Sequence, residues 1–365
     1  MKVAIIHYWL VNNRGGEKVL EAICELFPDA DIFTHVYNKE VFTESNIASH
    51  NINETFISKL PFAKKAYQNY LPLMPLALEE LDLTGYDLII SSESGPAKGV
   101  IPPPGVPHVC YCHSPMRYAW DMYHDYKKNA GYLKRLLMPI LMHYLRRWDQ
   151  LSSTQVTHFI SNSNFVAKRI ESYYQRQATV INPPVSCDSF SVSSTTGDYY
   201  LFLGQLVKYK RADLAVEAFN QSGKKLIIIG EGEQLPYLQK IAKSNIELRG
   251  KQPFSEIKLL IENCKALIFP GIEDFGIVPL EAMAAGRPVI AFSKGGATET
   301  VVDGLTGILF KEQNVQSLND AVCVYEQRKA SFNPEVIRLH ALKFDKTQFK
   351  IAFGQYIDTI FSGRK

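Results

Sequence analysis

The second half of the chain alternates short apolar runs with longer amphipathic runs, and this alternation restricts the fold more than any other feature of the sequence. The short runs have the length of buried strands, and they are Tyr199–Leu203, Lys225–Ile229, Ile246–Leu248, Ala266–Phe269, Val289–Phe292 and Ile308–Phe310. The longer runs have helical spacing, and they are Ala212–Ser222, Gln234–Lys243, Glu256–Cys264 and Val278–Ala285. Strands that alternate with helices predict right-handed crossovers and a mostly parallel, doubly wound sheet.

The first half repeats this architecture without repeating the sequence. It opens with a predicted strand at Val3–His7, a loop at Asn12–Gly16 and a helix at Lys18–Phe27. Further predicted strands are Ile32–His35, Asp87–Ser91, His108–Cys112 and His158–Ser161. A length of 365 residues suits two domains. Because Pro183-Pro184 and the polar stretch Ser186–Asp198 indicate a connection, we expect domains at 1–183 and 184–345.

Composition and charge exclude several classes of protein. The net charge of +3 is too small for a nucleic-acid-binding protein. Six cysteines do not make a disulfide framework, and Cys110 and Cys112 are interpreted as buried thiols on one face of a strand. The N-terminal apolar run has no cleavage site after it, and no stretch has transmembrane length. The chain is therefore expected to be cytoplasmic.

Two carboxylates lie close together in the segment Phe269–Phe292, FPGIEDFGIVPLEAMAAGRPVIAF. Glu273 is on a loop that follows a predicted buried strand, and Glu281 is expected in the first turn of the next helix, beside Pro279. Carboxylate oxygens bind sugar and ribose hydroxyls well, because charge strengthens the hydrogen bonds that they accept. The alternative is that Glu281 only stabilises the helix dipole and Glu273 is a solvated loop acid.

The spacing from Glu273 to Glu281 resembles the E-x7-E motif of family 4 glycosyltransferases, and the resemblance extends over nearly the whole chain. It implies an α/β GT-B fold, with two facing Rossmann-like domains and a C-terminal helix (346–365) that crosses back to the first. It implies a retaining reaction in which Glu273 positions the transferred sugar and Glu281 binds the ribose. Phe275, Gly276 and Ile277 are implied to border the donor.

Further segments carry the same resemblance. Gly15-Gly16 matches a glycine loop that meets the donor phosphates, where glycine allows close approach and a helix N-terminus attracts anions. Lys210, in LGQLVKYKRAD, matches a lysine that neutralises the donor diphosphate. Gln205 stands where the family usually has arginine, and Arg211 could compensate for the missing charge. A simple tight turn and a solvated charge run are the alternatives for these two segments.

Three other places complete the implied donor site. Gly295–Gly307 resembles the family's G-G-x-x-E segment and places Glu299 beside the nucleotide, while Gly250-Lys251 frames the base. His113, in CYCHSPMRYAWD, matches a histidine that reaches the transferred sugar, although a lone histidine is often structural. The extended motif resembles a subgroup that includes mannosyltransferases of bacterial surface polysaccharide assembly. It therefore implies GDP-mannose as donor and a glycan or polyprenyl-diphosphate-linked acceptor.

No metal or other cofactor is expected. Asp29-Ala30-Asp31 has the form of the D-x-D motif of metal-dependent glycosyltransferases, but it precedes a strand and therefore lies at the amino edge of the predicted sheet. The ligand crevice of such a sheet is at the opposite edge.

One predicted helix has an unusually wide apolar stripe. Its apolar members are Leu133, Leu136, Leu137, Ile140, Leu141, Tyr144, Leu145 and Trp148, and the surrounding cations are Lys128, Lys134, Arg135, Arg146 and Arg147. Packing of this helix on its own domain is the simpler interpretation. Contact with anionic lipid at the inner leaflet is the alternative, and Lys59, Lys64 and Lys65 could contribute to it.

Other functions remain open at this point. A GT-B sugar-nucleotide epimerase could share the fold, and so could a non-catalytic subunit of a polysaccharide-assembly complex. The sequence argues against a dehydrogenase, because no predicted strand is followed by G-x-G-x-x-G and a ribose-binding acid.

Overall fold

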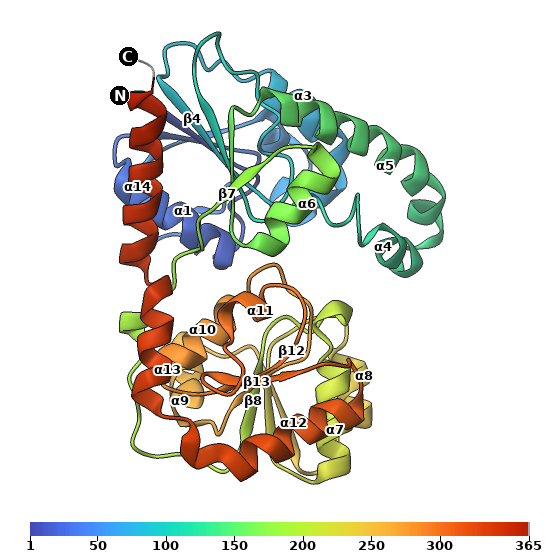
Figure 1. Ribbon diagram of the computed structural model, residues 1–365. Helices are drawn as coiled ribbons and strands as arrows, with labels where there is room; N and C mark the ends of the chain where they lie inside the picture. The colour runs from blue at the N-terminus through green and yellow to red at the C-terminus, as the bar shows by residue number, and fades with distance from the viewer. Residues whose placement is uncertain (364–365) are drawn as a thin grey trace. The chain divides into compact units, whose positions relative to one another are not determined.

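The computed structural model describes residues 1–363, except the side chain of Asn129. The chain divides into two compact units, shown in Figure 1. The first comprises Met1–Asn182 and the chain from Phe349 onward, and the second comprises Pro183–Gln348. The predicted linker boundary is one residue later, and the returning helix begins at Lys346, as predicted.

The first unit is built on a parallel sheet of seven strands in the order β3-β2-β1-β4-β5-β6-β7. The strands are β1 (Val3–His7), β2 (Asp31–Thr34), β3 (Asn51–Glu54), β4 (Leu88–Glu93), β5 (His108–Cys112), β6 (His158–Ser161) and β7 (Ala178–Val180). Side chains alternate between the faces, so Val3 and Ile5 enter one apolar core and Ala4 and Ile6 another.

Helices cover both faces of this sheet. One face packs against α1 (Gly15–Leu26) and the last part of α14 (Lys346–Ser362), whose Phe349, Phe353, Ile357 and Ile360 form a buried helical stripe. The other face packs against α3 (Met74–Glu79), α5 (Tyr132–Ser152) and α6 (Asn164–Tyr174). Two short helices, α2 (Ala63–Ala66) and α4 (Tyr123–Asn129), lie outside these layers.

The second unit has a parallel sheet of six strands in the order β10-β9-β8-β11-β12-β13. Its strands are β8 (Tyr200–Leu203), β9 (Leu226–Ile229), β10 (Ile246–Gly250), β11 (Leu267–Phe269), β12 (Val289–Phe292) and β13 (Gly307–Phe310). Helices α7 (Ala212–Ser222), α8 (Leu235–Ile241) and α12 (Val315–Arg328) pack together on one side. On the other side are α9 (Phe254–Asn263), α10 (Ile277–Ala284), α11 (Ala297–Thr300) and α13 (Pro334–Ala341), as Figure 1 shows.

The predicted α/β class with two Rossmann-like parallel sheets is confirmed. Two strands were not predicted, because β3 has the polar sequence NINE and β7 is only three residues long. The first helix begins at Gly15 and not at Lys18, so the glycine pair opens the helix and does not end a loop. Among residues 1–363, no helix is long and apolar enough to cross a membrane.

Candidate functional site

Lys210 and Glu273 meet at the carboxyl edge of the second sheet. Lys210 follows β8 and Glu273 follows β11, and these neighbouring strands are where the strand order of the sheet reverses. Such a switch point is the usual ligand crevice of an open α/β sheet, because the two crossovers leave it in opposite directions. The Nζ of Lys210 lies 2.8 Å from Oε1 of Glu273, and the two side chains are 14% and 20% exposed. The structure therefore brings two predicted site residues, 63 positions apart, into one ion pair.

Glycine allows the two loops that carry this pair to touch. A Cβ added at Gly271 would lie 2.7 Å from the Cα of Lys210 and 2.9 Å from the carbonyl oxygen of Tyr209. A Cβ at Gly204 would lie 3.3 Å from the Nζ of Lys210, so the lysine side chain runs along bare backbone. Any larger residue at Gly271 would separate the loops and, with them, Lys210 from Glu273.

The Gly295-Gly296 turn packs on the loop that carries Glu273. The amide of Gly296 donates to the carbonyl of Glu273 at 2.8 Å, and a Cβ at Gly296 would lie 2.3 Å from the Cα of Phe275. Gly276 then caps α10 with φ of +91°, a left-handed conformation that favours glycine. Glu273, Phe275, Gly276 and Ile277 therefore form one loop and helix start beside the Lys210 ion pair.

The two other predicted acids are half-buried. Glu281 is the fifth residue of α10, so the prediction that it lies in the first helical turn is wrong. Because the helix dipole acts mainly within the first turn, a purely dipole-stabilising role for Glu281 loses its physical basis. Glu299 lies on α11, directly after the Gly295-Gly296 turn.

The remaining predicted residues of this unit are spread along the same edge. Arg211 binds the Asp213 carboxylate, with Nε to Oδ1 at 3.1 Å, so it would have to exchange this partner for a phosphate. Gln205 is exposed in the loop after β8. Gly250 ends the edge strand β10, two strands from β8 and followed by Lys251. Two strand spacings are about 10 Å, which is within the length of a nucleotide sugar.

In the first unit the structure brings His113 to the start of α1. Gly15 and Gly16 are the first two residues of this helix, so their amides face outward from its N-terminus. A Cβ on Gly16 would lie 2.8 Å from the Tyr8 hydroxyl and 3.7 Å from Nε2 of His113. Burial and the neighbouring His7 lower the pKa of His113 to about 3, so its ring is neutral near pH 7. Nε2 also lies 2.8 Å from Oγ of Ser92.

The motif that follows His113 holds the surrounding elements together. Arg169 of α6 donates to Oγ of Ser114 at 2.7 Å and binds Oδ1 of Asp121 at 2.6 Å. Trp120 donates its indole N–H to Asp149 of α5 at 2.7 Å. These motif residues therefore have structural partners, which hold in place the segment that begins with His113.

Sequence reasoning missed a fully buried ionic cluster behind this segment. Lys98 binds Glu93 at 2.9 Å and also binds Asp149, and all three side chains are inaccessible to solvent. Glu93 accepts the Lys98 amide as well, at 2.6 Å, and Asp149 accepts the hydroxyl of Tyr174 at 2.9 Å. The two carboxylates hold the pKa of Lys98 above its usual value. Only the polar residues inside an apolar stretch hint at this cluster in the sequence.

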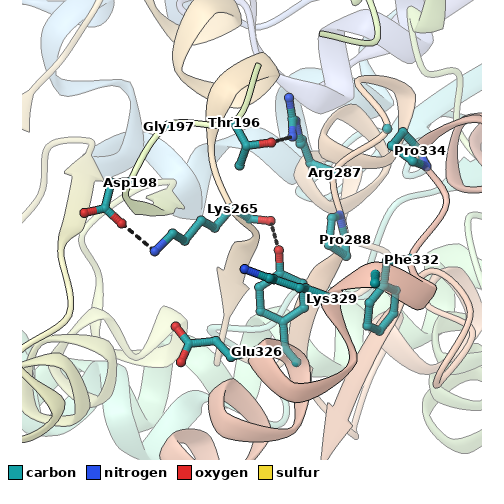
Figure 2. Close-up of a pocket in the computed structure, with 13 residues that line it drawn as sticks. Thr196, Gly197, Asp198, Lys265, Arg287, Pro288, Glu326, Lys329, Phe332 and Pro334 are labelled. Carbon is teal, nitrogen blue, oxygen red and sulfur yellow. Dashed lines mark hydrogen bonds and ion pairs between the residues drawn. The ribbon is translucent and has the colours of Figure 1, made fainter. Parts of the chain in front are cut away.

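A cavity of about 700 Å³ lies at the opposite, amino edge of the second sheet (Figure 2). Asp198 and Lys265, which precede β8 and β11, line it and bind each other at 2.5 Å. Arg287, before β12, donates to Thr196 at 2.7 Å and to backbone carbonyls. None of the predicted donor-binding residues is among the described residues that line this cavity. We assign this cavity a structural role, because its main charges already have partners.

The apolar stripe on α5 divides into two faces. Leu145 and Trp148 are buried in the first unit, as packing on the domain predicts. The outer part is not packed, and its exposed members are Leu133 (66%), Leu136 (64%), Leu137 (54%), Ile140 (75%) and Tyr144 (48%). The interpretation that the whole stripe packs inside its own domain is therefore wrong for these five residues.

No group of three or more side chains suitable for holding a metal ion gathers among the described residues. Asp31, from the D-x-D-like triplet, is the first residue of β2 and thus lies at the amino edge. It accepts hydrogen bonds from Tyr86 at 2.6 Å and from Asn51 at 2.7 Å.

Each half of the chain matches a glycosyltransferase family model. Residues 13–189 match the model of glycosyltransferase family 4, and residues 188–329 match that of glycosyl transferases group 1. An uncharacterized glycosyltransferase of Methanocaldococcus jannaschii is 29% identical over 48% of this chain and 52% of its own length. The alpha-1,3/1,6-mannosyltransferase alg-2 of Neurospora crassa is 27% identical over 56% of this chain and 54% of its own. The chain thus spans about half the length of these curated relatives.

Solved structures share the fold at low sequence identity. The Anabaena protein HepE, in complex with UDP and glucose, is 17% identical with a TM-score of 0.73, covering 98% of this chain and 100% of that one. Sucrose-phosphate synthase of Thermosynechococcus elongatus is 15% identical with a TM-score of 0.70, covering both chains fully. With its two parallel sheets and a glycosyltransferase model matched in each half, the chain has the GT-B fold of group 1 and family 4 glycosyltransferases.

Proposed function

We propose that this protein is a retaining glycosyltransferase that moves a sugar from a nucleotide donor to a glycan acceptor without a metal ion. In the front-face reaction, the bond from the sugar C1 to the diphosphate oxygen breaks, and the acceptor oxygen bonds to C1 on the same face. The acceptor proton passes to the leaving phosphate. Lys210 and the N-termini of α7 and α10 stabilise the charge that develops on that phosphate.

The ion pair between Lys210 and Glu273 carries this proposal. It places a cation and a hydroxyl-binding carboxylate 2.8 Å apart at the switch point of a sheet, where a diphosphate and its sugar present the complementary groups. Both side chains are partly exposed, so a donor can reach and separate them. Glu273 then binds the sugar hydroxyls, and Glu281 the ribose.

We infer GDP-mannose as the donor from two supports. One is the motif that begins at His113, and the other is the similarity to mannosyltransferases such as alg-2. The UDP bound to HepE supports a uridine nucleotide instead, although that protein shares only the fold. The acceptor we propose is a growing surface glycan on a polyprenyl diphosphate.

A donor panel tests the proposal. We expect GDP-mannose to raise the melting temperature more than UDP-glucose, UDP-galactose or GDP alone, and to be hydrolysed slowly without acceptor. Preference for a UDP-sugar would overturn the assignment of GDP-mannose, but the proposal of a glycosyltransferase would stand. Conversion of the donor to an epimer, or binding without any turnover, would instead indicate an epimerase or a non-catalytic subunit.

A lipid-linked acceptor requires the enzyme to reach a membrane surface, and α5 offers the contact. Its exposed residues Leu133, Leu136, Leu137, Ile140 and Tyr144 recur at helical spacing on one face. Lys134 donates to Asn69 at 3.2 Å, which ties this face to the segment after the exposed Phe62, Lys64 and Lys65. Lys128 and Arg147 are also exposed. Apolar side chains with surrounding cations match an anionic bilayer, not a neutral one.

Cosedimentation with liposomes of varied anionic content, at two salt concentrations, tests this contact. We expect binding to rise with anionic lipid and to weaken with salt, because each cation near the surface contributes about 1 kcal/mol. Leu136→Ser with Ile140→Ser should weaken partitioning by at least about tenfold. Leu259→Ser, on a similarly exposed leucine of α9, should not. Pelleting that ignores lipid charge, or no pelleting, would contradict the proposal.

A further inference from the structure

Four polar side chains form a line through the carboxyl edge of the first sheet. The Oγ of Ser92 lies 2.8 Å from Nε2 of His113 and 3.1 Å from Nδ1 of His7. The other nitrogen of His7, Nε2, lies 3.8 Å from Oε1 of Glu17. His7, Ser92 and Glu17 are all buried. None of these three is part of the proposed donor site.

Strand register explains why these groups meet. His7 ends β1 and is paired with Ser92 of β4, and Ser92 is in turn paired with Tyr111 of β5. Paired residues of parallel strands point to the same face, and His113 follows Tyr111 by two positions. The backbone also fixes His113 directly, because its amide donates to the Glu93 carbonyl at 2.7 Å.

The hydrogen bonds at Ser92 allow two arrangements of protons. A hydroxyl has one hydrogen, so Ser92 donates to one histidine and accepts from the other. In the first arrangement His113 donates from Nε2 to Ser92, and Ser92 donates to Nδ1 of His7. His7 then carries its proton on Nε2, toward Glu17. In the second arrangement all directions are reversed, and a bare lone pair on His7 faces the Glu17 carboxylate.

Glu17 decides between the two. Within the described residues, Nε2 of buried His7 has no hydrogen-bond partner, and the Glu17 carboxylate lies 3.8 Å from it. A proton on that nitrogen is attracted by the carboxylate, whereas a lone pair is repelled by it. Glu17 is itself held in place, because its Oε2 accepts the amide of Arg14 at 2.9 Å.

We propose that Glu17, His7 and Ser92 are positioning residues that hold His113 in its Nε2–H tautomer. The Nε2 proton is then donated to Ser92, and the other ring nitrogen, Nδ1, keeps a lone pair that can accept a hydrogen bond from a hydroxyl of the donor. In the other tautomer Nδ1 would carry the proton and could only donate to that ligand. The inference rests on the proposed function only in assigning the donor to this edge.

The tautomer can be measured without activity. In the full chain with 15N-labelled histidine, long-range 15N–1H correlation distinguishes the two tautomers, and His113→Asn identifies the His113 signal. We expect the Nε2–H form in the unaltered protein and a mixture in Glu17→Gln, which keeps the shape and the contact with Arg14. Glu25→Gln, on the same helix, is the matched control.

Kinetics provide the second readout. We expect Ser92→Ala and Glu17→Gln to lower kcat about tenfold with KM nearly unchanged, as for a lost hydrogen bond that strengthens in the transition state. The Nδ1–H form in the unaltered protein, or the same tautomer in both variants, would overturn the inference. Tautomer control in a protein that turns over no nucleotide sugar would instead refute the proposed function alone. If Ser92→Ala does not fold, the isosteric Glu17→Gln still decides.

Discussion

The two sheets have the same order around their switch points, yet they support their polar residues differently. Behind β4 and β5 of the first sheet, charged groups are sealed in the core, with Lys98 between Glu93 and Asp149. At the edge of β8 and β11 in the second, Lys210 and Glu273 form an ion pair in a partly open site. In the first unit, the protein itself supplies Lys98 with both acidic partners. In the second unit, a ligand can replace one partner of the ion pair between Lys210 and Glu273.

This difference distinguishes residues that hold other side chains in position from residues that bind a ligand. Buried partners fix a side chain before a ligand arrives, which lowers the cost of ordering it later. An open ion pair is worth little by itself, so separating it costs a ligand little. We therefore expect substitutions in the buried Lys98 cluster to change mainly stability. Substitutions in the ion pair between Lys210 and Glu273 should change mainly turnover.

The largest effect should come from Lys98→Met. It leaves two carboxylates buried without their cation, and breaking a buried pair in this way costs about 3–5 kcal/mol of unfolding free energy. All three tryptophans, Trp9, Trp120 and Trp148, lie in the first unit, so fluorescence during urea unfolding reports that unit alone. Lys128→Met, on an exposed lysine, should change stability by less than about 0.5 kcal/mol. Equal stability of the two variants would remove the contrast between the clusters.

Lys210→Ala should produce the opposite pattern. Loss of a preorganised charge at the leaving group lowers kcat by about 10²–10³-fold. The unfolding free energy should change by less than about 1 kcal/mol, because a partly exposed pair contributes little to stability. Lys208→Ala, two residues earlier and exposed, is the control. A large loss of stability with normal turnover would show that this pair is structural, like the buried cluster.

Acid should weaken the first unit more than the second. Burial lowers the pKa of His35 to about 4 and that of His108 to about 3, so both stay neutral in the folded state below the pH at which the unfolded chain protonates them. Stability is therefore unaffected above pH 6.5 and falls below it, by about 2 kcal/mol per histidine at pH 5. The second unit contains one histidine, His340.

Tryptophan fluorescence in urea at pH 7 and pH 5 measures this loss. His108→Asn should make the first unit's stability less dependent on pH by about 2 kcal/mol over this range. His124→Asn, at an exposed position, should not change that dependence. An unchanged dependence in both variants would mean that carboxylates dominate the acid response.

The sequence predicted elements best where apolar residues recur in a clear strand or helix pattern. The bounds of β1, β5, β6, β12 and α7 agree with the prediction to the residue. The polar β3 could not be found, because its sequence NINE has no apolar run and the strand is only partly buried. Nor could periodicity decide which part of α5 is exposed, since both of its faces are apolar.

The site was predictable as positions but not as contacts. Residue types and a family resemblance indicated Lys210 and Glu273, yet their ion pair depends on the close approach that Gly271 allows. Lys98 shows the limit more clearly, because lysine is almost never fully buried and no pattern around it announces two acidic partners. The line from Glu17 to His113 depends on strand register, which the sequence does not reveal.

Chelation of metal ions should have the smallest effect on turnover. It tests whether the site at the edge of the second sheet works without a metal ion. If Lys210 and the N-termini of α7 and α10 supply the positive charge, excess EDTA should leave turnover unchanged, in contrast to Lys210→Ala. The one triplet of D-x-D form is at the amino edge, where Asp31 already accepts two hydrogen bonds. Turnover that EDTA abolishes and Mg²⁺ or Mn²⁺ restores would mean that a cation bridges the diphosphate. In that case Mg²⁺ should also partly restore the turnover of Lys210→Ala. No such restoration would mean that the lysine, not a metal ion, neutralises the diphosphate.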